Sequence, residues 1–290
     1  YQYASPLSIP ILLYYTFDPN RASQRANEFL EAPDIRIIRL FYSALDSWFA
    51  RKIALQFLPK LKLIPKLGTA LTFTMSTNAS YDPILNEWNN LDNDPNNPWT
   101  NIKTLKIKLF HVDQVKYFDR KSVVPMINEE GVIFFIHGGG FMANFCSSDL
   151  RFLAQWSEIT NLPIIEVDYS LFPAQYPIAL QECLIAYKLL CEGKLGFNTR
   201  RIIIIGDSSG CNLAVSMLIK IIVFKLRLPD LLILSSPILN LSKQPTPSRL
   251  LFMMDPLVPM NLVTQCRKYY YSDTNIDDLL FVSPLISVTD

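Results

Sequence analysis

The chain has 290 residues, half of them hydrophobic, and its formal net charge is +1 at pH 7. This length suits one large α/β domain or a catalytic domain with a cap, and the near-neutral charge gives no electrostatic basis for binding nucleic acid. Five cysteines without paired spacing fit reduced thiols in a cytoplasmic protein, and no apolar run reaches the roughly 18 residues of a membrane span.

Residues 1–99 carry the weaker structural signals. Helical spacing appears between Asp34 and Leu58, and a stretch with basic residues among Leu, Ile and Phe follows from 51 to 66. We interpret that stretch as part of a helix packed on its own domain with its lysines in water; association with a lipid surface is the alternative. The polar, proline-broken segment 89–98 is the best linker candidate. We therefore expect a mainly helical cap or regulatory region over 1–99 and a catalytic domain over 100–290.

From residue 100 onward the sequence takes a β/α rhythm. We expect helices at 149–160, 177–190 and 208–226, and strands, the first with an exposed face, at 103–109, 131–136, 163–167, 202–205 and 231–234. Strands that alternate with helices form a parallel sheet, whose active site lies at the carboxyl ends of the strands. The sequence thus predicts an α/β fold with a mostly parallel sheet flanked by helices.

A glycine-rich turn follows the second of these strands, where Val132–Ile136 runs directly into His137, Gly138, Gly139 and Gly140. Acyl transfer develops negative charge on a carbonyl oxygen, and preorganised backbone N–H groups stabilise that charge. Successive glycines let the main chain turn its N–H groups inward without interference from Cβ atoms. Alone, the motif is weak support for an oxyanion hole, but a second motif strengthens it.

The second motif is GDSSG at 206–210, between the isoleucine run Ile202–Ile205 and a predicted helix. In that context G-x-S-x-G is typical of a nucleophile elbow, with Ser208 at the tip of a strained turn and Ser209 supplying an oxyanion N–H. An ordinary strand-to-helix loop and the GDSGG of chymotrypsin-like proteases are the competing interpretations. Those proteases are all-β, however, and the HGGG motif favours the elbow.

HGGGF together with GDSSG resembles the hormone-sensitive-lipase family of α/β-hydrolases. The resemblance runs from about Thr100 to Asp290 and includes DYSLFP at 168–173, ALQEC at 179–183, SRLLFMMDPLVP at 248–259 and SPL at 283–285. It implies an α/β-hydrolase fold, no cofactor, and hydrolysis of carboxylic esters, either acylglycerols or sterol esters, through an acyl-serine intermediate. It also implies a role in lipid catabolism in the cytoplasm, with association at a lipid-droplet or membrane surface. We leave the oligomeric state open.

The resemblance assigns Ser208 as the nucleophile and His137, Gly138, Gly139, Gly140 and Ser209 to the oxyanion hole. Two histidines and scattered cysteines make no metal site. In the family the triad acid and histidine follow the SPL stretch, whereas this sequence stops at Asp290, apparently truncated before both.

Other residues that could complete a triad are less suitable. We expect His111 at a sheet edge, Asp207 in a loop-bracing role, and Asp255 in a cap-side turn. The chain by itself is therefore expected to be inactive or nearly so. The alternative function is a truncated or non-catalytic protein that keeps the pocket but lacks the base.

Overall fold

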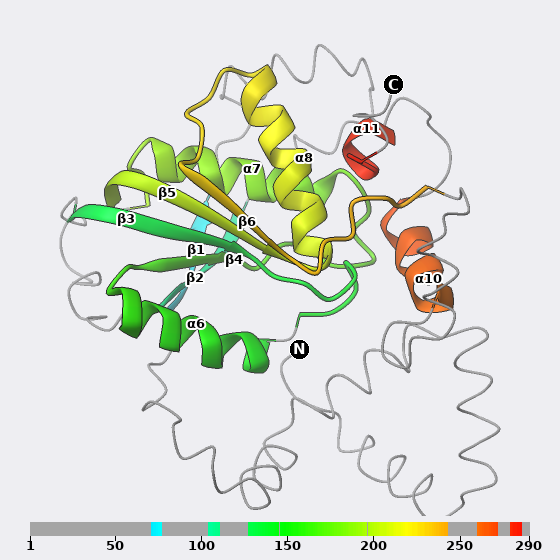
Figure 1. Cartoon of the computed structure of the whole chain (residues 1–290), viewed down its shortest axis with the longest axis horizontal. Helices are drawn as coiled ribbons and strands as arrows, with labels where there is room; N and C mark the ends of the chain where they lie inside the picture. The colour runs from blue at the N-terminus through cyan, green and yellow to red at the C-terminus, as the bar shows by residue number, and fades with distance from the viewer. Residues whose placement is uncertain are drawn as a thin grey trace, which may run out of the picture.

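The computed structural model describes residues 71–76, 104–110, 127–144, 146–195, 197–242, 260–271 and 279–285. Within these residues, six strands form one sheet in the order β1-β2-β4-β3-β5-β6 (Figure 1). The strands are β1 (Leu71–Ser76), β2 (Thr104–Phe110), β3 (Ile127–Ile136), β4 (Ile164–Val167), β5 (Phe197–Asp207) and β6 (Leu231–Ser235). The helices are α6 (Cys146–Thr160), α7 (Ile178–Cys191), α8 (Ser209–Val223), α10 (Met260–Tyr270) and α11 (Leu279–Val282).

The strands that carry the two motifs are neighbours in the sheet. The pairings of β3 with β4, β3 with β5 and β5 with β6 are parallel, while the β1–β2 and β2–β4 pairings are antiparallel. The register of β3 and β5 runs from Ile127 opposite Phe197 to Ile136 opposite Gly206. Because parallel strands end at the same edge of a sheet, this register brings the HGGG and GDSSG segments together.

Helices cover both faces of the sheet, α7 and α8 on one side and α6 on the other (Figure 1). Adjacent residues of β3 show the alternation. Phe134 packs edge to face on Tyr187 of α7 with ring centroids 5.7 Å apart, and Phe135 packs on Phe152 of α6 at 5.8 Å. Both phenylalanines are buried. A continuous apolar run, rather than an alternating one, is what a parallel strand covered on both faces requires.

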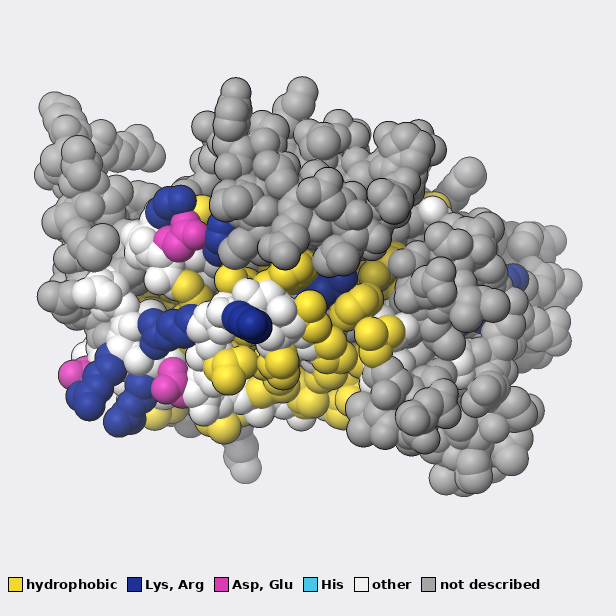
Figure 2. Space-filling model, turned by 90° about the horizontal axis from the view of Figure 1, so that it is seen from above, with side chains coloured by type: hydrophobic (Ala, Val, Ile, Leu, Met, Phe, Trp, Pro, Cys, Tyr) yellow, Lys and Arg dark blue, Asp and Glu magenta, His cyan; other side chains and the backbone are white. Residues whose placement is uncertain are grey.

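Strand β6 is an edge of the described sheet, and it is less covered than β5. Leu231 and Ile233 are 50% and 43% exposed. Ile222 and Val223, at the end of α8, are each 57% exposed. Figure 2 shows hydrophobic side chains gathered on one face of the described part of the chain. Within the described residues, this end of the sheet therefore combines an unpaired strand edge with apolar surface.

The α/β fold with a mostly parallel sheet is confirmed, and each strand and helix predicted after residue 100 is present with shifted boundaries. The exposed face expected for 103–109 is wrong at Lys108, which is 4% exposed because it pairs with Glu166 of β4. Within 1–99, expected to be mainly helical, β1 is a strand that pairs with β2, so the sheet begins before residue 100. The remainder of 1–99, including the predicted helix and the basic stretch, lies outside the described residues, and the domain boundary stays a prediction.

Candidate active site

Ser208 occupies the tip of the turn between β5 and α8. Its backbone has φ 51° and ψ −115°, a conformation that costs an L-residue about 1–3 kcal/mol. Two backbone hydrogen bonds hold it there: Ser208 N donates to Ser235 O over 2.8 Å, and Cys211 N donates to Ser208 O over 3.1 Å. The end of β6 and the first turn of α8 thus stabilise the strained residue, and Ser208 remains partly exposed.

The glycines on either side of Ser208 are required by packing. A Cβ atom on Gly206 would lie 2.8 Å from Cys211 Cα, and one on Gly210 would overlap Ile136 O. Gly206 therefore lets α8 begin directly against β5, and Gly210 lets it pass over the end of β3. The G-x-S-x-G spacing follows from these two close approaches.

The HGGG turn lies against this elbow. A Cβ atom on Gly138 would lie 2.7 Å from Asp207 Oδ2 and 3.1 Å from Ser208 Cβ. Gly139 and Gly140 have φ values of 110° and 62°, which glycine adopts without strain. Met142 N and Ala143 N both donate to Gly139 O, over 3.1 and 3.0 Å. These bonds close a tight turn whose first glycine touches Ser208.

Backbone N–H groups of the HGGG turn and of the first turn of α8 lie close to Ser208 in the fold. The N–H of Gly140 is already engaged, because it donates to Ser209 Oγ over 3.0 Å. Within the described part of the chain, the N–H groups of Gly138 and Gly139 donate to no other residue. Ser209 N lies in the first turn of α8, where backbone N–H groups have no intrahelical acceptor. Among the described residues, the N–H groups of Gly138, Gly139 and Ser209 are therefore left without an acceptor, and groups of this kind can stabilise negative charge.

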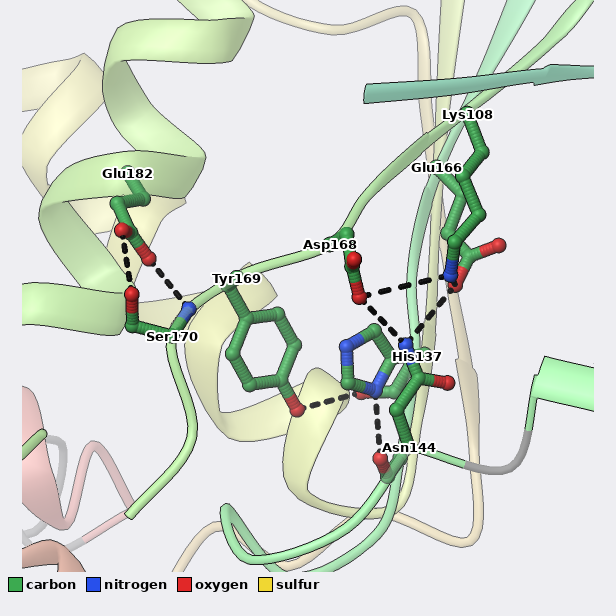
Figure 3. A network of polar contacts seen from close by, with 9 residues as sticks. Lys108, His137, Asn144, Glu166, Asp168, Tyr169, Ser170 and Glu182 are labelled. Carbon is green, nitrogen blue, oxygen red and sulfur yellow. Dashed lines mark hydrogen bonds and ion pairs between the residues drawn. The ribbon is translucent and has the colours of Figure 1, made fainter. Parts of the chain in front are cut away.

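His137 is fully buried beneath the turn and supports it (Figure 3). Its Nδ1 donates to Gly138 O over 2.7 Å, its ring stacks on Tyr169 at 4.0 Å between centroids, and Tyr169 Oη donates to His137 O over 2.9 Å. Burial lowers the pKa of His137 to about 4. The imidazole is therefore neutral at pH 7, and its proton is on the nitrogen that binds Gly138.

A buried charge network lies beside His137 (Figure 3). Lys108 Nζ of β2 is 3.1 Å from Glu166 Oε1 and 3.5 Å from Asp168 Oδ1. Asn144 Nδ2, at the end of the turn, donates to Asp168 Oδ1 over 2.9 Å and to Glu166 Oε1 over 3.5 Å. Burial raises the pKa of Glu166, and the Lys108 ammonium opposes that rise. These side chains join β2 and β4 to the turn that follows β3.

Helix α10 covers another side of the turn. The ring of Phe141 stacks on that of Tyr270 with centroids 3.7 Å apart, and Tyr176 N donates to Tyr270 O over 2.7 Å. A Cβ atom on Gly140 would lie 2.6 Å from Cys266 Sγ. Sequence reasoning identified neither α10 nor these contacts, and the only signal was the run of three tyrosines at 269–271.

Comparison with known proteins places this arrangement in a family. Residues 133–290, more than half of the chain, match the family described as alpha/beta hydrolase fold. The chain belongs to that family. Over 146 residues this α/β-hydrolase is 38% identical to the hormone-sensitive lipase of Mus musculus, a match that covers 49% of the chain and 19% of the relative. Over 197 residues it is 27% identical to an esterase of Acinetobacter venetianus, covering 68% and 62%.

Solved structures resemble the hydrolase in fold. An esterase from Pyrobaculum calidifontis matches 87% of this chain and 69% of its own with a TM-score of 0.60 and 18% identity. A structure from work on two fungal esterases of Rhizomucor miehei matches 87% and 67% with a TM-score of 0.62 and 19% identity. The match covers only about a fifth of the length of the mouse relative, 19%.

Of the three other residues considered for a triad, the structure describes only Asp207. His111 and Asp255 lie outside the described residues, and Asp207 Oδ2 lies against Gly138. Among the described residues, no group of three or more His, Cys, Asp or Glu side chains could hold a metal ion, and no described helix is long and apolar enough to cross a membrane. Four described cysteines carry free thiols: Cys183, Cys191, Cys211 and Cys266.

Proposed function

We propose that this protein hydrolyses carboxylic esters through an acyl intermediate on Ser208. The contact between Gly138 and Ser208 carries the proposal. It sets a serine held at φ 51° beside the turn that carries the Gly138 and Gly139 N–H groups, and these donate to no other described residue. A nucleophile next to preorganised donors is the arrangement that acyl transfer requires.

In the proposed reaction, Ser208 Oγ attacks the carbonyl carbon of the ester while its proton passes to a base. The carbonyl oxygen becomes negative and accepts hydrogen bonds from the N–H groups of Gly138, Gly139 and Ser209. The bond to the alcohol oxygen then breaks, and the alcohol leaves with a proton. Water attacks the acyl-serine by the same steps and releases the acid. Gly140 and His137, also predicted for the oxyanion hole, act in this proposal as supports, because both are engaged with other groups.

The base is not His137. Its Nδ1 proton is donated to Gly138 O, its ring is stacked under Tyr169, and its pKa of about 4 makes it a weak base. Triads of this fold follow the chain order serine, acid, histidine, and the 290-residue sequence has no histidine after His137. We therefore expect turnover by the protein to depend on a base other than His137.

The proposed substrates are acylglycerols or sterol esters. The support is the 38% identity to hormone-sensitive lipase over 146 residues and the match to several esterases. We also propose that the protein acts in the cytoplasm at a lipid-droplet or membrane surface. Its support is the resemblance to hormone-sensitive lipase, together with the alternative interpretation of the basic apolar stretch at 51–66 as a lipid-surface segment. Hydrolysis of dioleoylglycerol and cholesteryl oleate emulsions, compared with that of p-nitrophenyl butyrate, tests the substrate class.

Covalent labelling tests the nucleophile. The protein, expressed in its natural host, is treated with a fluorophosphonate, and the modified peptide is identified by mass spectrometry. We expect one label per chain at Ser208, lost in Ser208→Ala. Ser235→Ala is the matched control, because Ser235 contacts Ser208 only through a backbone carbonyl that this substitution keeps. Equal labelling of Ser208→Ala would reject the assignment, and a folded protein that takes no label would favour the non-catalytic alternative.

A further inference from the structure

Both ends of the HGGG turn are attached to the segment that leaves β4 (Figure 3). At the start of the turn, Tyr169 Oη donates to His137 O and the two rings stack. At its end, Asn144 Nδ2 donates to Asp168 Oδ1 over 2.9 Å. Two consecutive residues, Asp168 and Tyr169, therefore hold the turn from opposite ends, and together with Asn144 and His137 they form what we call the β4 clasp.

The end of the turn is coupled closely to its glycines. Asn144 directly follows Ala143, whose N–H donates to Gly139 O over 3.0 Å. A further bond ties the middle of the turn to the same segment, because Phe172 N donates to Phe141 O over 3.0 Å. A displacement of Asn144 would consequently reach the Gly139–Gly140 peptide unit, next to the unit that carries the Gly139 N–H, through a single residue.

The acceptor of the Asn144 hydrogen bond, Asp168, belongs to a charge cluster around a buried lysine. Asp168 and Glu166 share the ammonium of Lys108, at 3.5 and 3.1 Å, and Lys108 and Glu166 are only 4% and 1% exposed. A lysine buried to this extent stays charged only if carboxylates compensate it, and the carboxylates are held in turn by the lysine. The amide of Asn144 supplies hydrogen-bond donors to this cluster without adding charge to it.

We propose that Asn144 is a positioning residue of the oxyanion hole, which acts through Asp168 to fix the direction of the Gly138 and Gly139 N–H groups. The inference rests on the proposed ester hydrolysis. Oxyanion donors act only when they lie about 2.7–3.1 Å from the position of the charged oxygen. A misplacement of about 1 Å can lower the rate by about 10²-fold. Loss of the clasp should accordingly lower kcat and leave KM nearly unchanged.

Four variants of the protein, expressed in its natural host, test the clasp. Asn144→Ala and Asp168→Ala each remove the bond, whereas Asp168→Asn keeps an oxygen that can accept it. Glu182→Gln is the matched control: Glu182 accepts a hydrogen bond over 2.7 Å from Ser170 Oγ in the same loop, and no hydrogen bond between described residues joins Ser170 or Glu182 to the turn. Steady-state hydrolysis of p-nitrophenyl butyrate is measured together with amide hydrogen exchange of peptides that cover 138–143.

For Asn144→Ala and Asp168→Ala we expect kcat to fall about 10- to 100-fold with KM within about two-fold of wild type. Exchange in 138–143 should become about ten-fold faster or more, while exchange in β4 stays unchanged. Asp168→Asn should recover most of kcat, and Glu182→Gln should match wild type in both measurements.

Several results would overturn the inference. These are unchanged exchange in 138–143 for folded Asn144→Ala, unchanged kcat despite faster exchange, or an equal loss of kcat in Glu182→Gln. If Asn144→Ala does not fold, the comparison of Asp168→Asn with Asp168→Ala decides by the same criteria. A wild-type protein that turns over no ester would reject the proposed function instead, and the exchange measurement would still show whether the clasp holds the turn.

Discussion

Gly138 and Ser208 touch where the two motifs meet: a Cβ atom on Gly138 would lie 3.1 Å from Ser208 Cβ and 2.7 Å from Asp207 Oδ2. Such distances leave no room for a side chain at Gly138. They also set the backbone of Gly138 next to the proposed nucleophile. The contact joins β3 to β5 across the carboxyl edge of the sheet, where their parallel register ends.

Gly138→Ala should therefore displace either the turn or the elbow. We expect a fall in kcat of about 10²-fold or more, since loss of one oxyanion donor costs about 10²–10³. Gly131→Ala is the control in the same strand, because its new Cβ would lie 3.5 Å from Leu162 Cδ1, an ordinary contact. Ester hydrolysis by the two variants gives the comparison. Equal activity in both variants would contradict the close approach of Gly138 to Ser208 and Asp207.

The buried imidazole of His137 should make stability depend on pH. Its pKa is lowered from 6.5 to about 4, so the unfolded chain binds this proton more tightly than the folded one. The stability from keeping His137 neutral is complete above pH 6.5, falls as the pH drops, and is lost below about pH 4. The full change is roughly 3 kcal/mol. The difference in urea unfolding free energy between wild type and His137→Gln should shrink over that range, and a difference independent of pH would contradict the pKa.

Tyr270 presents a buried hydroxyl that no other described residue binds, on a ring stacked against Phe141. Removing the hydroxyl leaves the stacking in place and relieves an unsatisfied polar group. Tyr270→Phe should then be neutral or stabilising, by up to about 1–3 kcal/mol. Tyr270→Ala should destabilise by about 3–5 kcal/mol, because it removes the whole ring. Thermal unfolding of both variants tests these two expected changes in stability. A clear loss of stability in Tyr270→Phe would mean that the hydroxyl has a hydrogen-bond partner.

The edge strand β6 should tolerate charge on its exposed face. Leu231→Lys is expected to change stability by less than about 0.5 kcal/mol and to reduce self-association, since charged side chains discourage pairing of sheet edges. Ile204→Ala, at a fully buried position of the neighbouring strand, should cost about 2–5 kcal/mol. Urea unfolding and light scattering measure the two effects. A large destabilisation by Leu231→Lys would show that its side chain is covered.

The 290-residue chain by itself should be a poor catalyst. A serine hydroxyl needs a base within about 2.6–3.2 Å, and His137 is bound to Gly138 instead. Removal of the triad histidine from a serine protease cost about 10⁶ in kcat, and a similar deficit is expected here. Purified chain is assayed with p-nitrophenyl butyrate. Turnover typical of an esterase, and abolished by Ser208→Ala, would mean that a residue of this sequence serves as the base.

The sequence by itself determined the local units of this hydrolase. The strand–turn–helix around Ser208 could be predicted because four isoleucines need burial on both faces of a sheet, and because Gly206 and Gly210 occupy positions where a Cβ atom would collide with backbone. The order of strands and helices from residue 100 to β6 followed in the same way from hydrophobic patterns within each segment. These properties depend on near neighbours in the chain.

Only the tertiary structure decided how the site is held. Lys108 reads as a solvent-facing residue of an alternating strand, and its burial depends on carboxylates that the sheet order places beside it. The same holds for the bond of Asn144 to Asp168 and the stacking of Phe141 on Tyr270, which join segments far apart in sequence. A lysine or an asparagine carries no local signal of its partner. The partner is fixed by strand register and helix packing, and these depend on many weak contacts distributed over the whole fold.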